Sequence, residues 1–233
     1  MEIQEPSPRL LIAALRFGAV SPLLLDVRGN LIASISKQSG LTEWNALPDL
    51  VQLYSADARR FFQASIRDVY VSIENFEDLE EARSWASGVI AGTLEGLDIA
   101  EISWMGTRMH WLSAAGSFSE LRDWFISRFG SIARTAIDAI GRGPSDVGVV
   151  LEFKDRSPLI TMRFGPMTAE QAMTQFFRDK EATHFPDEFL FVDIDHVHPD
   201  EHLNRRQAIS TFDERVDNLA ILGGQVAAAI ARA

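Results

Sequence analysis

Runs of alternating apolar and polar residues, separated by helices with clear start signals, constrain the fold of this chain most. The clearest alternation lies within Arg60–Glu74, and another long one spans Ile99–Leu112. A period of two is typical of a β-strand whose two faces meet different surroundings. Shorter apolar runs at Arg9–Phe17, Leu50–Tyr54 and Phe189–Ile194 are also expected to be strands, so the whole chain should contribute to a sheet.

Helix start signals stand between these strands. Asp78, Ser117 and Thr168 each precede a Glu or Gln by three residues, which is the spacing of a capping box. The longest helix is expected from about Arg205 to Arg232, where apolar residues recur at alternating three- and four-residue intervals. Such a narrow apolar seam suits packing either across a sheet or against another helix.

Residues 22–38 allow two interpretations. Ser21-Pro22 has the form of an N-cap followed by proline in the first helical position, and Gly40 is a typical stop signal. These signals favour a helix. The alternative is a hairpin that turns at Gly29-Asn30, because small residues there permit a tight turn.

The order of these elements predicts an α+β protein with a largely antiparallel sheet, or sheets, packed by helices. Val147–Lys154 and Leu159–Phe164 flank turn residues and are expected to form a hairpin. A doubly wound parallel fold requires stricter alternation of strand and helix. The succession suggests two related β-α-β halves in a single globular domain (1–233), with subdomains at about 1–116 and about 143–233 that helices within 117–141 join.

Charge and composition limit the classes of partner that are expected for this chain. The chain has 33 acidic and 22 basic residues in 233, a net charge of −11. Nucleic acid and anionic membranes attract clustered lysine and arginine, so neither is expected as a partner. Cysteine is absent, which agrees with a cytoplasmic location and excludes thiolate chemistry. No apolar run approaches the ~18 residues of a membrane span.

A metal site is one candidate for chemistry. Asp193, Asp195, His196 and His198 lie close together, and carboxylates and imidazoles are common ligands of divalent metals. In an extended segment, the two histidines would share one face. The alternative is an exposed polar loop between a buried strand and the last helix, because Pro199 follows directly.

A ligand site is the second candidate. Trp104, Arg108 and His110 fall on one side of the expected strand Ile99–Leu112, with Gly106 between them. An arginine beside aromatic residues on a sheet can hold a carboxylate or phosphate. The alternative is an exposed sheet face on which arginine and tryptophan stack, or on which the arginine pairs with an acid from a helix. Gly106 predicts a bulge or a close backbone approach.

Three segments of the chain resemble a sporadically distributed bacterial family that has no assigned function. They are the first strand ending in Arg16-Phe17, the Gly106-x-Arg108 pattern, and the late strand ending in Asp193-Ile-Asp195 before a long C-terminal helix. Met109 departs from the aromatic residue of the family's pattern. The resemblance implies an α+β fold and carries no activity. The patchy distribution implies an accessory role such as defence, toxin immunity or prophage function.

These observations lead to ranked hypotheses. The first is a non-enzymatic binding or interaction protein without a cofactor, with a protein partner or self-association, because the chain is acidic and lacks motifs of known catalytic classes. The second is a metal-dependent hydrolase using the segment Asp193–His202 and a divalent metal. The third is a sensor that binds an anion at Arg108.

Overall fold

The computed structural model describes residues 3–130, 139–140, 144 and 146–232, and within them ten strands form one antiparallel sheet. The strands are β1 (Ser7–Phe17), β2 (Glu43–Leu47), β3 (Leu50–Tyr54), β4 (Arg60–Ser65), β5 (Asp68–Glu74), β6 (Glu101–Ala114), β7 (Val149–Phe153), β8 (Leu159–Thr168), β9 (Glu188–His198) and β10 (Leu203–Asn204). The helices are α1 (Leu23–Ser39), α2 (Leu79–Gly96), α3 (Phe118–Phe129), α5 (Ala169–Gln175), the 3₁₀ turn η1 (Ala182–His184) and α6 (Arg205–Arg232). The expected α+β fold with a long C-terminal helix is confirmed.

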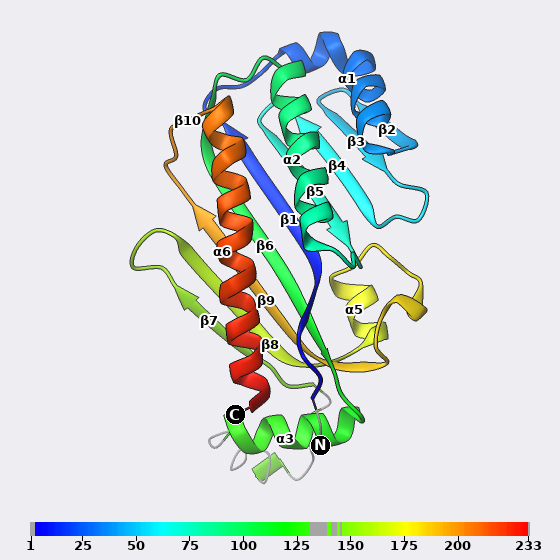
Figure 1. Cartoon of the computed structure of the whole chain (residues 1–233), viewed down its shortest axis with the longest axis vertical. Coiled ribbons are helices and arrows are strands. Elements are labelled where there is room, and N and C mark those ends of the chain that lie inside the picture. The colour runs from blue at the N-terminus through cyan, green and yellow to red at the C-terminus, as the bar shows by residue number, and fades with distance from the viewer. Residues whose placement is uncertain (1–2, 131–138, 141–143, 145, 233) are drawn as a thin grey trace.

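The strand order has an internal symmetry. The strands run β2-β3-β4-β5-β1-β6-β9-β8-β7, with β10 pairing beside β6, so β1 and β6 lie together at the centre. Outward from β1 come β5, β4, β3 and β2, and outward from β6 come β9, β8 and β7. The first half contains a central strand, a helix, four further strands and a final helix. The second half contains a central strand, a helix, the strands β7, β8 and β9 with α5 and η1 between the last two, and then β10 and the final helix. One continuous sheet contains the strands of both halves (Figure 1).

Helices α1, α2 and α6 cover one face of the sheet (Figure 1). Their buried residues pack with the odd-numbered residues of β1 and β6 and the even-numbered apolar residues of β9 into the main core. Leu15, Met109 and Val192 are examples of sheet residues with no accessible surface. Burial of this many aliphatic and aromatic side chains is the main term that stabilises the fold.

The opposite face of the sheet has a smaller cover. At one end, α5 and η1 pack over it in a second apolar cluster, which includes Leu10, Leu112, Phe177, Phe189 and Phe191. Between this cover and the far edges, the structure as described leaves side chains of the central strands accessible. We call this surface the open face.

Residues 22–38 are helical. Helix α1 runs from Leu23 to Ser39 and is followed by its C-cap residue Gly40, whose φ of 73° is readily adopted by glycine. The expected N-cap role of Ser21 is wrong, because Pro22 occupies that position and no side chain caps the helix. The Ser21 hydroxyl instead donates to the carbonyl oxygen of Leu97 at 3.3 Å.

Strand boundaries differ from the expectation in three places. Arg60–Glu74 is two antiparallel strands, β4 and β5, because Ser65 accepts backbone N–H groups from Arg67 and Asp68 and so stabilises a turn. Strand β2 was not predicted, because it is only five residues long and all five are exposed. Strand β9 continues to His198, four residues beyond the expected end at Ile194, so the interpretation of His196 and His198 as a loop is wrong.

The helix signals were mostly correct. Asp78, Ser117 and Thr168 cap α2, α3 and α5, and Thr168 forms a complete capping box with Gln171. Helix α6 has the expected bounds and packs on β6 as well as on α2. Most of the helical region expected between Gly130 and Gly141 lies outside the described residues. Among the described helices, none combines the length and apolar character that crossing a bilayer requires.

Candidate functional site

Strand β6 brings Trp104, Arg108 and His110 to the open face, as the alternation of the sequence predicted. They are cross-strand neighbours of residues on the same face of adjacent strands: Trp104 lies beside Arg16, and Arg108 beside Asp195. His110 lies beside Asp193, which in turn neighbours Arg163 on β8. The register of four strands thus places three arginines and two carboxylates on one surface.

Arg108 and Asp193 form a two-pronged ion pair. Arg108 donates from Nε and Nη2 to the two carboxylate oxygens of Asp193, at 2.7 and 2.6 Å. Burial of Asp193 opposes its ionisation, but the contacts with His110 and Arg108 outweigh burial and lower its pKa to about 2. Burial also opposes the charge of Arg108, and the hydrogen bonds to Asp193 outweigh it and raise the arginine pKa. Arg108 is therefore paired with an acid, but the acid comes from strand β9 and not, as the alternative interpretation expected, from a helix.

His110 lies beneath this ion pair and not at the surface. Its side chain is 1% exposed, and its Nε2 is 3.2 Å from Oδ1 of Asp193. The rings of Phe176, Phe177 and Phe191 surround it with edge-on contacts at 5.0 to 5.8 Å between ring centres. Burial lowers the pKa of His110, which keeps the imidazole neutral. A ligand on the open face would therefore meet Arg108 before His110.

Trp104 lies flat on the sheet because Gly106 has no side chain. A Cβ atom at Gly106 would be 2.6 Å from Cη2 of Trp104, so this glycine makes room for a ring of its own strand and not for the expected bulge or backbone approach. The Arg16 guanidinium lies over the indole, 4.8 Å from its centre. This is a cation–π arrangement, and it holds the exposed Arg16 side chain against the sheet.

Arg178 is a fourth arginine on this face, and no sequence pattern predicted that it would lie there. It follows α5, and its guanidinium lies 3.8 Å from the ring centre of Phe61 and 5.7 Å from that of Tyr70. It also donates to the Ser72 hydroxyl at 3.2 Å. Its position depends on Glu74, which accepts the backbone N–H groups of Arg178 and Asp179 and so fixes this segment to β5.

The open face therefore presents several exposed arginines in an acidic protein. Arg16, Arg163 and Arg178 are exposed, and none forms an ion pair in the part of the chain that the structure describes. Of the nearby carboxylates, Asp193 is already bound by Arg108, Glu74 accepts the backbone N–H groups of Arg178 and Asp179, and Asp68 is the cross-strand neighbour of Arg16. Asp195 is half-buried, and burial raises its pKa. Three guanidinium groups remain available to an incoming anion.

The four predicted metal ligands do not converge. Because β9 is a continuous strand, Asp193 and Asp195 lie on the open face, whereas His196 and His198 point to the opposite face under α6. Among the described residues, no group of three or more His, Cys, Asp or Glu side chains is arranged to hold a metal ion. The metal hypothesis placed the two histidines on one face of an extended segment, but in such a segment residues 193 and 195 point to the face opposite residues 196 and 198.

The two histidines have a cationic neighbour instead. Arg215 of α6 donates to Glu201 at 2.6 Å, and Glu201 lies 3.6 Å from Nδ1 of His198. Burial, together with the charge of Arg215, lowers the pKa of His196 and lowers that of His198 to about 4. The positive charge of Arg215 would repel a metal cation at these imidazoles. The residues present on this side do not fit a divalent metal.

Comparison of the sequence with protein-family models and with curated proteins found no match. The resemblance carried by Arg16-Phe17, Gly106-x-Arg108 and Asp193-Ile-Asp195 stays a prediction. In the fold these three segments are adjacent, because β1, β6 and β9 are consecutive strands at the centre of the sheet.

Proposed function

We propose that this chain is a non-enzymatic binding protein that holds an acidic protein partner on its open face. The observation that carries the proposal is the group of three exposed arginines without ion-pair partners among the described residues: Arg16, Arg163 and Arg178. The chain as a whole has 33 acidic and 22 basic residues, so this grouping of arginines does not follow from a basic composition. A face that leaves three guanidinium groups unpaired is suited to carboxylates from another molecule.

Stacking makes two of these arginines effective contact residues. Arg16 rests on Trp104, and Arg178 rests on Phe61 and Tyr70. A guanidinium that is already held against a ring loses little conformational freedom when it binds a carboxylate. Arginine and aromatic residues also dominate the binding energy of many protein interfaces.

A protein partner suits these charges better than a nucleic acid. The net charge of −11 repels a long polyanion, whose binding requires many lysine and arginine contacts along its backbone. A protein with a local acidic patch needs only a few complementary contacts, which the open face supplies. A nucleic acid bound at this face is an outcome that the experiment below would detect.

Binding is favoured over catalysis by the state of the central residues. The carboxylate of Asp193 is taken up by Arg108, and His110 is enclosed by phenylalanine rings. A general acid or base must reach the proton that it transfers, and His110 is 1% exposed. The metal-dependent hydrolase is not proposed further, because its four candidate ligands lie on two faces of the sheet.

The resemblance described above adds a biological setting to this proposal. It implies an accessory role, such as toxin immunity, another defence function or the assembly of a larger complex. A cytoplasmic location belongs to the same proposal, and the absence of cysteine agrees with a reducing compartment. An immunity protein that neutralises a toxin through a charged surface would have the properties proposed here.

The test is native mass spectrometry of the tagged protein isolated gently from its own host. We expect an added protein mass that is lost in the double variant Arg16→Gln/Arg178→Gln and at high salt, because charged contacts at an exposed surface are screened. The matched control is Arg128→Gln/Arg206→Gln, which removes two exposed arginines from α3 and α6, away from the open face. The control should retain the partner.

Three results would contradict the proposal. One is a bare monomer in all preparations. The second is a partner that both double variants retain equally. The third is an added mass that nuclease treatment removes, which would assign the face to nucleic acid. Far-ultraviolet circular dichroism of each variant shows that a loss of partner is not a loss of fold.

A further inference from the structure

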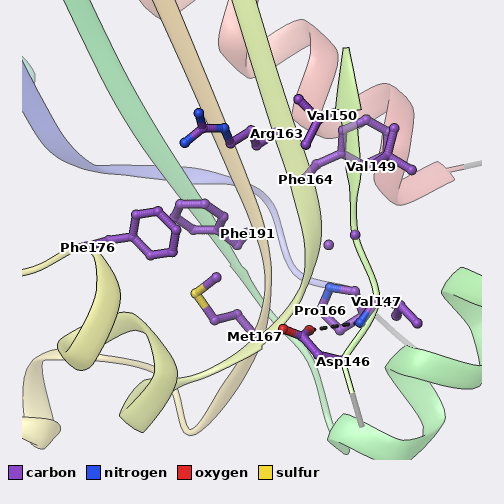
Figure 2. Close-up of a pocket in the computed structure, with 12 residues that line it drawn as sticks. Asp146, Val147, Val149, Val150, Arg163, Phe164, Pro166, Met167, Phe176 and Phe191 are labelled. Atoms are coloured by element: carbon purple, nitrogen blue, oxygen red, sulfur yellow. Dashed lines mark hydrogen bonds between the residues drawn. The ribbon is translucent and has the colours of Figure 1, made fainter. Parts of the chain in front are cut away.

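A pocket of about 300 Å³ opens beside Arg163 at the end of the open face. It lies between β8, the segment that leads into β7, and the phenylalanines of α5 and β9 (Figure 2). The backbone creates it: Gly165 lets Val147 approach so closely that a Cβ atom at Gly165 would be 2.6 Å from the Val147 carbonyl oxygen. A residue with a side chain is therefore not tolerated at Gly165 without moving this segment.

The wall of the pocket is mainly apolar. The apolar side chains on the same side of the sheet as Arg163 are Val150 of β7, Met167 of β8, Phe191 of β9 and Phe176 after α5. Phe164 and Val149 also line the pocket, but they pair with each other across β7 and β8 and pack toward the main core on the opposite face. At roughly 30 Å³ for each non-hydrogen atom, the volume suits a group of about ten such atoms. That is the size of an aryl or branched aliphatic group with a short tail.

Charged groups lie at two ends of this wall. Figure 2 shows Arg163 at one end and Asp146 at the other. The cross-strand neighbour of Arg163 is Asp193, whose two oxygens already accept hydrogen bonds from Arg108, so Arg163 has no ion-pair partner among the described residues. The Asp146 carboxylate accepts its neighbour's N–H, from Val147 at 2.8 Å, and its negative charge disfavours a ligand carboxylate at that end.

We infer that this pocket binds an apolar monocarboxylate, with the hydrocarbon part against Val150, Met167, Phe176 and Phe191 and the carboxylate on Arg163. Burial of the apolar part supplies affinity, and the guanidinium fixes the orientation through charge-assisted hydrogen bonds. Two sources have this chemistry: a free organic acid, and the C-terminal residue of a protein. The second source rests on the proposed function, since it would anchor the partner's end beside the open face.

The test is isothermal titration with 3-phenylpropionate and with its uncharged amide. We expect saturable one-to-one binding of the acid, and affinity lower by about tenfold or more for the amide and for the Arg163→Gln variant, because a hydrogen bond to a charged group is lost. The control is Arg156→Gln, which removes an exposed arginine from the turn between β7 and β8, outside the pocket lining. It should bind the acid as the unaltered protein does.

A second pair of ligands separates the two sources. An acetylated tetrapeptide ending in phenylalanine, with a free C-terminal carboxylate, is compared with the same peptide as an amide. Tighter binding of the free peptide than of 3-phenylpropionate assigns the pocket to a protein C-terminus, and the reverse assigns it to a small acid. If neither acid binds, if acid and amide bind equally, or if Arg163→Gln leaves both affinities unchanged, the inference is wrong.

These results are independent of the test of the open face. The Arg16→Gln/Arg178→Gln variant should bind 3-phenylpropionate normally, because neither residue lines the pocket. A protein that binds the acid but captures no partner would lose only the proposed function. A protein that captures a partner through Arg16 and Arg178 but binds neither acid nor peptide would lose only this inference.

Discussion

At the scale of single residues, the central charged group of the open face is Asp193. Its side chain is 2% exposed, and removing a carboxylate from water is costly unless the charge is compensated. Compensation comes from the two hydrogen bonds of Arg108, which reach it from the neighbouring strand. The ion pair between Asp193 and Arg108 therefore stabilises the folded chain only while the Asp193 carboxylate is ionised.

This arrangement predicts a specific dependence of stability on pH. The pKa of Asp193 is about 2 in the folded protein, against an ordinary value of 3.8, so its contribution is complete above about pH 4 and is lost as the pH falls towards 2. The contribution amounts to about 2 kcal/mol. The difference in free energy of unfolding between the unaltered protein and Asp193→Asn should shrink by that amount between about pH 6 and about pH 2.

Chemical denaturation at a series of pH values measures this difference. The control is Asp49→Asn, which removes an exposed carboxylate that makes no ion pair in the described chain. Its difference from the unaltered protein should stay near zero throughout. A gap for Asp193→Asn that does not change with pH would mean that the ionised carboxylate does not stabilise the fold.

At the scale of elements, the contact of α6 with the sheet depends on a glycine. Gly223 lies at the middle of the apolar seam, and the ring of Trp111 on β6 occupies the space where its side chain would be. A Cβ atom there would be 2.0 Å from Cη2 of Trp111, which is 2% exposed and cannot move outward. The helix therefore approaches the sheet closely at this point.

Two neighbouring glycines provide a matched pair of variants. Gly223→Ala should destabilise the protein by about 1–3 kcal/mol, because the core must deform to accept the methyl group. Gly224→Ala has nothing within 4 Å of the new Cβ atom and should be neutral or stabilising by up to about 1 kcal/mol, since alanine favours the helix. Thermal and chemical unfolding of both variants measures this. Equal stabilisation by both would show that Trp111 does not pack against α6 as described.

At the scale of the whole molecule, the two edges of the sheet are unusual. Both edge strands, β2 and β7, expose large apolar side chains: Trp44 and Leu47 on β2, and Val150, Leu151 and Phe153 on β7. An edge strand has backbone groups free to pair with another strand, and proteins usually protect such edges with charge or proline. Self-association was expected as one form of partner, and these edges are where it would occur.

A lysine on the second edge tests this expectation. Phe153 is half exposed, so Phe153→Lys should change the free energy of unfolding by no more than about 0.5 kcal/mol. Association at high concentration, measured by light scattering, should decrease, because a charge on an edge strand disfavours pairing. The control is Arg128→Lys on α3, which should leave association unchanged. Unaltered association in Phe153→Lys would exclude this edge as the contact.

Local sequence signals determined most of the elements. Period-two alternation predicted β6 and placed Trp104, Arg108 and His110 on one face, because side-chain direction in a strand depends only on position along it. Capping residues predicted where α2, α3 and α5 begin, because they satisfy backbone groups a few residues away. The same alternation explains why the metal site was wrong. Because β9 extends to His198, Asp193 and Asp195 lie on one face of the sheet and His196 and His198 on the other.

The tertiary structure decided which distant residues share a surface. Arg16, Arg163 and Arg178 are far apart in the sequence, and the register of the central strands and the attachment of the segment after α5 to Glu74 bring them together. A net charge of −11 gave no sign of a face with several exposed arginines, because composition does not record where charges lie. Register and packing are set by contacts between segments, and a single sequence specifies those contacts only through the fold that satisfies all of them at once.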